Sequence, residues 1–332
     1  MSGKLILLEI LNVVGRCSFK FLMRNKFTVL LPFLTVFVSC TVFSQDLRPG
    51  LQGMAPIKWI TIKTTQAPGR VYRSINSQSK TYTHEDIYFR AWIPVVAKSK
   101  FGLAIGPHYR TEQLELKRPG EDPMKQLSNW RLRSMGIDIK SFIKLDSTSW
   151  LINTAQISQS GNLNYHSGNS IPLCYTFSAL YLKKKSINKE LGFGLMVNKS
   201  SSFMVLPVFV FNYNYSSRSG IEISLPHKIS WRHNLTPSDI LYIKSEAVTR
   251  TYFVNGVNGT DRGLFRRIDV DMGIAYNKQF GRLIGAELFA GYRQNVSYEL
   301  PQDLVSVKNS GWAASFEIYI RPPQGFHLGK KK

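Results

Sequence analysis

From residue 86 onward, apolar and polar side chains alternate along most of the chain. The clearest example is 265–277, where Ile268, Val270, Met272, Ile274 and Tyr276 alternate with Arg267, Asp269, Asp271, Gly273 and Ala275. A strand places successive side chains on opposite faces, so it separates these two sets completely. A helix would put Asp269 and Asp271 about 200° apart and would bury neither set cleanly. The pattern therefore predicts β-strands.

The same alternation recurs in five further segments, which are 86–97, 134–145, 240–254, 282–294 and 311–321. Seven more segments are candidate strands, namely 57–63, 101–112, 150–158, 173–183, 190–198, 203–215 and 221–232. Turn-forming residues separate them, as in Asn277-Lys-Gln-Phe-Gly. We expect one all-β domain at 56–321, preceded by a leader at 45–55 and followed by a polar tail at 322–332.

The candidate strands favour a membrane barrel over a soluble fold. Many run to about 11–15 residues, whereas soluble strands average about five or six and a tilted membrane strand needs about 9–11. Charges gather on one face of each strand, which suits a wet lumen opposed to lipid. Trp130, Trp150, Trp231 and Trp312 fall at predicted strand ends, as in aromatic girdles, although Trp92 is mid-strand. A secreted or periplasmic β-sandwich is the alternative fold.

The number of candidate strands disagrees with the number that a bacterial barrel should have. The segments above number thirteen, but single-chain bacterial barrels have even strand numbers. Short and long loops should also alternate, and the two halves of the chain obey that rule in opposite phase. We therefore expect a transmembrane antiparallel up-and-down barrel of about 12 strands, in the range 10–14, with the counting error within 190–240.

The polar faces of the clearest strands define a lumen-facing charge network. Its eight basic members are Arg90, Lys140, Lys144, Lys244, Arg250, Arg267, Arg293 and Arg321. Its six acidic members are Asp138, Glu246, Asp269, Asp271, Glu287 and Glu317. Near balance of charge predicts salt bridges that brace or close the lumen, while a pore-lining role stays open. On this face assignment, Ile274→Arg should impair insertion and Asn277→Arg should be mild.

The N-terminus has the features of an export signal. Arg24 and Lys26 precede the apolar run 27–43, and Val42 and Ser44 fit the small residues before a signal-peptidase site. We expect a signal peptide at 1–44 with cleavage after Ser44, and a true start at Met23. Two alternatives stay open: the run is retained as a membrane anchor, or Cys40 is a lipoprotein cysteine.

Composition and charge limit the partners and cofactors that we expect for this protein. The 332-residue chain has a formal charge of +22, and Lys183–Lys185 and Lys330–Lys332 are basic clusters outside the clearest strands. Contact with lipid phosphates, including those of lipopolysaccharide, is one use for such charge, and ordinary solvation is the other. We expect no nucleic-acid partner for an exported barrel. Three cysteines, no HExxH and no glycine-rich phosphate loop give no warrant for a metal or nucleotide cofactor.

Two resemblances support export to an outer membrane. Asn309–Phe316 is similar to the terminal-strand signal read by the barrel assembly machinery, although eleven residues follow Arg321 where typical barrels end on an aromatic residue. The stretch 207–243, PVFVFNYNYSSRSGIEISLPHKISWRHNLTPSDILYI, resembles an uncharacterised family of Gram-negative outer-membrane β-barrel proteins. That family is a domain of unknown function, so the resemblance implies a fold and a location but no activity and no catalytic residues.

Three functional hypotheses follow. The first is a structural barrel or a channel for small anionic solutes. The second is a lipid-modifying or hydrolytic enzyme, for which the candidate groups are His108, His227, His233, Ser230 and the Asp269/Asp271 pair. The third is an adhesion protein that binds through loops 113–129 and 295–310. Since Asp269 and Asp271 lie beside Arg267, charge pairing is the simpler interpretation of that pair.

Overall fold

The structure is a computed structural model that describes residues 49–73, 79–116, 131–162, 171–255, 262–299 and 310–322. The expected signal peptide, its cleavage site, Cys40 and residues 323–332 of the tail lie outside the described residues. No helix in the described ranges is long and apolar enough to cross a membrane.

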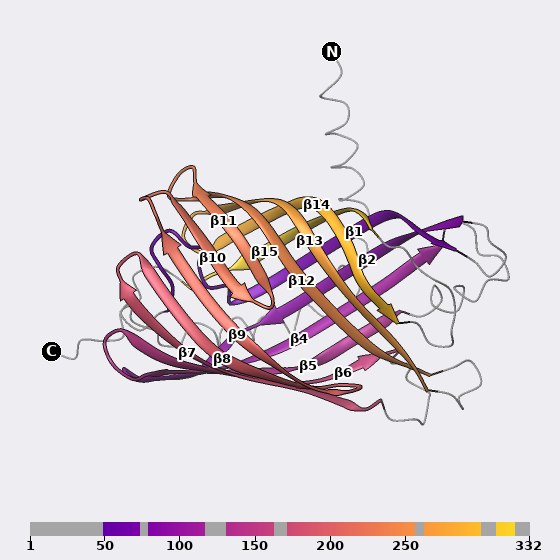
Figure 1. The fold of residues 1–332 in the computed structure, drawn as a ribbon, viewed down its shortest axis with the longest axis horizontal. Helices are drawn as coiled ribbons and strands as arrows, with labels where there is room; N and C mark the ends of the chain where they lie inside the picture. Colours follow the sequence, from indigo (N-terminus) through magenta and orange to yellow (C-terminus); the bar gives the residue numbers. More distant parts are fainter. Residues whose placement is uncertain are drawn as a thin grey trace, which may run out of the picture. The chain divides into compact units, whose positions relative to one another are not determined.

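The described chain forms one antiparallel sheet that closes on itself (Figure 1). Its strands are β1 (Ile60–Arg73), β2 (Ser79–Ala91), β3 (Ile93–Ala97), β4 (Phe101–Leu116), β5 (Leu132–Lys144), β6 (Ser149–Gly161), β7 (Leu173–Ser186), β8 (Lys189–Lys199), β9 (Phe203–Asn214), β10 (Ser219–Leu225), β11 (Lys228–Asn234), β12 (Asp239–Asn255), β13 (Arg262–Phe280), β14 (Ile284–Glu299) and β15 (Gly311–Ile320). Closure comes from β1, which pairs with β15, and from β2, which pairs with both β1 and β4.

The barrel has fourteen strands, because β2 and β3 act as one strand that is interrupted at Trp92. Both segments pair with β4, β2 through Tyr82–Arg90 and β3 through Ile93–Ala97. Fourteen lies within the expected range and is two more than the central value. The closed antiparallel all-β fold is confirmed.

The miscounted strand lies inside 221–232, which is a hairpin of β10 and β11 rather than one strand. Its register pairs Ile223 with Ile229 and Ser224 with Lys228. Odd-numbered residues therefore face one side of the sheet on both strands, and even-numbered residues face the other. The alternation of apolar and polar residues thus continues through the turn without interruption. The sequence pattern alone conceals such a turn.

The two ends of the barrel differ in their connections. The turn end carries the short connections 98–100, 145–148, 187–188, 215–218, 235–238 and 281–283, together with the start of β1 and the end of β15. The loop end carries the longer connections 117–131, 162–172, 256–261 and 300–310. Short connections therefore alternate with longer ones over most of the barrel, as in bacterial outer-membrane barrels, whereas the connections 200–202 and 226–227 on the loop side are also short. A turn at 281–283 replaces the one expected at 277–281, since β13 continues to Phe280.

One short connection shows how these turns are fixed. In the turn 145–148, the Asp146 carboxylate accepts hydrogen bonds from the Thr148 backbone N–H at 2.7 Å and from its hydroxyl at 2.9 Å. These bonds favour the ionised carboxylate and lower the pKa of Asp146 to about 2.

The outer face of the barrel is apolar and the inner face is polar. Outward side chains include Ile62, Ile137, Ile243 and Ile274, each more than half exposed. The inward neighbours on the same strands are mostly charged, hydroxyl or amide groups. Apolar groups leave water only if something covers them, so a continuous exposed apolar wall indicates lipid contact.

The aromatic girdle is only partly as expected. Trp312 is 73% exposed on the outer face, and Trp231 also lies on that face, whereas Trp150 is 2% exposed inside the barrel. Trp150 shares the inward parity of Ile152 on β6, so its position at a strand end does not bring it to the lipid. Trp130 lies outside the described residues.

The barrel narrows toward the loop end. The β10–β11 hairpin has only seven residues per strand, so β12 loses that neighbour beyond Ala247. Further along β12, Phe253 pairs with Gly161 of β6 in a parallel bridge. A Cβ on Gly161 would lie 2.1 Å from the Phe253 carbonyl oxygen, so glycine permits this close approach. The interior is therefore constricted where β6 and β12 meet.

Candidate functional site

The candidate site is the barrel interior. All fourteen residues of the charge network expected from the sequence have inward register positions. The structure places most of them in a central cluster, in a group near the turn end, or among lysines that line a cavity.

The central cluster is built around Arg267 on β13, which is 3% exposed. Its guanidinium donates to the carboxylates of Asp269 and of Glu112 on β4. His84 of β2 lies 2.8 Å from Glu112, measured from Nε2 to Oε1. Because burial removes these charges from water, each must be compensated inside the cluster.

A second arginine completes the cluster from β14. Arg293 donates from Nε and Nη2 to the two carboxylate oxygens of Asp271, at 2.5 and 2.7 Å. It also contacts His84, with 3.2 Å between Nη1 and Nδ1. Asp269 and Asp271 are thus each paired with an arginine, which removes the free paired carboxylates that acid–base chemistry would need.

Glu112, His84, Asp86 and Arg110 belong to this cluster but were not among the expected network residues. Arg110 donates to Asp86, joining β4 to β2. The pattern Gly106, His108, Arg110 and Glu112 shows the required alternation in 101–112. Pro107 and Thr111 on the opposite face are only weakly apolar, so the alternation of apolar and polar residues in this segment is weak.

The group near the turn end links β12, β14, β15 and the segment before β1. Lys244 lies 2.6 Å from Glu287, and Lys58 lies 2.5 Å from Glu317 and 3.5 Å from Glu287. Burial alone would lower the pKa of Lys58, but the Glu287 and Glu317 carboxylates outweigh it and raise that pKa above its ordinary value. Lys58 therefore stays charged and fastens its segment to the wall.

Four other network members have partners outside these groups. Arg321 donates to Gln279, and Glu246 lies 3.3 Å from the exposed His227. Asp138 lies 3.7 Å from Arg90 and 3.2 Å from His108.

The segment before β1 lies inside the barrel at the turn end. The Gly50 N–H donates to Glu190 at 2.9 Å, and Asn214 donates to the Gln52 carbonyl at 2.9 Å. Asn234 donates to the Gly53 carbonyl at 3.1 Å. Residues 49–55, here called the inner segment, are thereby held against the inner faces of β8, β9 and β11.

An apolar plug closes the interior at the loop end. Its members are Tyr82, Leu114, Leu132, Tyr252, Val254 and Phe265, each at most 3% exposed, with Tyr298 packed against them. They project inward from β2, β4, β5, β12 and β13, where the barrel is narrowest. Between this plug and the central cluster, a cavity of about 10 Å³ has room for about one water.

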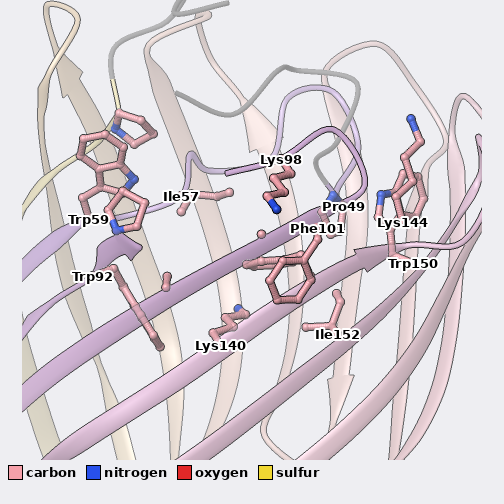
Figure 2. A pocket seen from close by; sticks show the side chains of 15 residues that line it. Pro49, Ile57, Trp59, Trp92, Lys98, Phe101, Lys140, Lys144, Trp150 and Ile152 are labelled. Carbon is pink, nitrogen blue, oxygen red and sulfur yellow. The ribbon is translucent and has the colours of Figure 1, made fainter. Parts of the chain in front are cut away.

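A larger cavity of about 230 Å³ opens at the turn end (Figure 2). Aromatic and aliphatic groups form most of its wall, including Trp59, Trp92, Phe101, Phe142 and Trp150. Three lysines also line it, namely Lys98, Lys140 and Lys144. The first belongs to the turn after β3 and the other two to β5.

The structure does not assemble the enzyme candidates. His227 lies in the β10–β11 turn, and Ser230 faces inward with its hydroxyl directed at the Glu222 carbonyl, 3.4 Å away. His233 instead contacts Ser219, at 2.7 Å between Nδ1 and Oγ. Ser219 is 7% exposed. Loops 113–129 and 295–310 fall largely outside the described residues.

No group of three or more His, Cys, Asp or Glu side chains within the described ranges is placed to hold a metal ion.

Several solved structures are similar to this barrel. The COG4313 outer membrane channel from Pseudomonas putida F1 has a TM-score of 0.42 and 12% identity, over 82% of this chain and 99% of its own. A deltaS2 mutant of TodX, a monoaromatic hydrocarbon channel of Pseudomonas putida, has a TM-score of 0.40 and 8% identity, over 81% and 92%. LpxR from Salmonella typhimurium has a TM-score of 0.37 and 6% identity, over 79% and 100%. At these identities no residue role is transferred.

No curated protein matches the chain by sequence. The family described as Domain of unknown function (DUF6268) matches residues 115–306, more than half of the chain and most of the barrel wall from β5 to β14. The chain therefore belongs to this family of unknown function.

Proposed function

We propose that the protein is an outer-membrane β-barrel that passes small anionic solutes when two internal blocks move aside. The observation that carries this proposal is the closed wall itself, apolar outside and charged inside, whose interior is obstructed by the inner segment and the plug. A wall of this kind needs lipid on its outer face.

The proposed orientation places the turn end in the periplasm and the loop end outside the cell. Bacterial barrels have short periplasmic turns and longer extracellular loops. The signal peptide with cleavage after Ser44 and the barrel assembly machinery belong to this proposal as its route of export. Lipopolysaccharide and other outer-membrane lipids are its proposed partners, and basic residues at the membrane rim would contact their phosphates.

The two blocks differ in how they are held, which makes them separable. The inner segment is held by a few hydrogen bonds and the Lys58 ion pairs, and it is continuous with the N-terminal side of β1. The plug is formed by side chains of the wall itself. Opening thus requires the segment to leave and the plug side chains to rearrange.

Conductance across planar bilayers tests the proposal. The mature protein should show little or no current, because both blocks are closed. Deletion of residues 45–57 combined with Tyr252→Ala and Phe265→Ala should produce discrete, anion-preferring conductance steps, since it removes the inner segment and two plug rings. A matched control combines the deletion with Phe316→Ala, which truncates a 41% exposed aromatic side chain on the outer face. If the variant with the deletion and both plug substitutions folds but carries no current, the protein is a structural barrel instead.

A further inference from the structure

The cavity at the turn end has a wall of unusual composition. Its apolar part is supplied by four strands and by Pro49, Ile57 and Trp59 of the chain before β1. Its charged part is supplied by lysines, because no Asp or Glu is among the described residues that line it. The volume of about 230 Å³ exceeds the roughly 150 Å³ of an engineered apolar cavity that accepts benzene.

Two of these lysines form no ion pair with the described carboxylates. Neither Lys98 nor Lys140 lies within 4.0 Å of a carboxylate in the part of the chain that the structure describes. In Figure 2, both side chains extend toward the space beside Phe101, whereas Lys144 points away from it. Two other lysines inside this barrel are paired, Lys58 with Glu317 and Lys244 with Glu287. Lys98 is exposed and Lys140 is half-buried, and ammonium groups without an ion pair beside an apolar wall favour an anion with an apolar body.

The wall also holds an unused donor. Trp150 is 2% exposed, and its indole Nε1 has no hydrogen-bond partner among the described residues. Lys184 lies 5.2 Å from the ring centroid, which helps to hold this side chain in place. A buried N–H without a partner costs free energy, and a ligand oxygen would satisfy it.

From these observations we propose that the cavity binds a small organic anion: a carboxylate on an aromatic or short alkyl body. The carboxylate lies between Lys98 and Lys140, and the body packs against Trp92, Phe101 and Phe142. The chain's own tail is a poor occupant, because Lys330–Lys332 would bring three like charges toward the lysines. This binding is an equilibrium property, so it does not depend on whether the barrel conducts.

Fluorine NMR on the full mature chain in phosphatidylcholine nanodiscs tests the proposal. The probes are para-trifluoromethylbenzoate and an octanoate with a terminal trifluoromethyl group, each beside its alcohol analogue, with empty nanodiscs as the background. At least one acid should bind saturably, and more tightly than its alcohol. Lys140→Met and Lys98→Met should each weaken acid binding by about tenfold or more, since each removes a charge-assisted interaction. Binding of the alcohol should change little.

Matched variants separate charge from folding. Lys185→Met makes the same charge change at an exposed site outside the cavity and should leave acid binding unchanged. Ile152→Trp fills the cavity and should abolish binding of acid and alcohol alike, while the heat-shifted band on a gel reports folding. The proposal is overturned by equal affinity for acid and alcohol, or by equal losses in Lys140→Met and Lys185→Met. It is also overturned if binding appears only after residues 323–332 are deleted, which would identify the tail as the occupant.

Discussion

Arg267 gives the sharpest test of the central charge cluster. It contacts Glu112 and Asp269 at once, and the three side chains are 3%, 1% and 1% exposed. Arg267→Met keeps most of the side-chain volume but leaves two buried carboxylates without this partner. Removing one member of a buried ion pair typically costs about 3–5 kcal/mol. At about 1.4 kcal/mol per factor of ten, the folding equilibrium should fall by roughly a hundredfold or more.

Urea titration of the barrel in lipid vesicles measures this loss, with the heat-shifted gel band as the readout of folded protein. Arg250→Met is the matched control, because Arg250 lies directly across from Arg267 in the β12–β13 register and makes no ion pair among the described residues. Its removal takes away repulsion from Arg110 together with attraction to Asp86 and Glu112, so the free energy of unfolding should change by less than about 1 kcal/mol. Equal losses in the two variants would refute the cluster's role in stability.

Three further outcomes are expected. Arg232→Met should free the inner segment, whose Gln52 carbonyl faces the guanidinium, and limited proteolysis should cut it faster than in the exposed control Arg218→Met; equal rates would contradict this. Ile274→Arg should cost about 2–4 kcal/mol by exposing a charge to lipid, whereas the inward Ser178→Arg should lower the folded fraction much less. Asp146→Ala should lose stability present above pH 4, and its difference from the native chain should vanish as pH falls through about 2; a constant difference would exclude the ionised carboxylate as the cause.

The fold class was accessible from the sequence because a barrel repeats one simple rule. Each strand alternates between lipid and lumen, so strand identity survives even where propensity is weak. What the pattern could not show was the β10–β11 turn, since equal parity on both strands carries the alternation through it. A position at a strand end gives depth in the membrane but not the face of the strand, which is why Trp150 is expected in a girdle and lies inside.

Asn277 shows a related limit. Its expected place in a turn made an arginine there tolerable, but it lies inside β13 with no exposed surface and donates to Glu287 at 3.2 Å. Asn277→Arg is therefore expected to be costly rather than mild, and Ser178→Arg replaces it as the comparison.

The interior could be anticipated only in part. Alternation assigned the charged residues to one face, but the partners of each charge depend on strand order and register, which bring β4 beside β2 and across from β13. The cavity and the inner segment required three-dimensional information, because residues from 49 to 322 converge there. The spacing of residues along the sequence does not indicate that these segments meet in space.

Electron paramagnetic resonance on β13 tests the central claim most directly. Single spin-labelled cysteines are placed at 268, 270, 272, 274 and 276 and at the intervening positions 269, 271, 273 and 275, with Cys174→Ser as the background in the mature chain, reconstituted in lipid vesicles. The even positions should show high accessibility to oxygen and low accessibility to a water-soluble nickel reagent, as lipid contact requires. The odd positions should show the reverse or tight immobilisation. Nickel accessibility at the even positions, with no alternation of period two, would contradict a lipid-facing apolar wall.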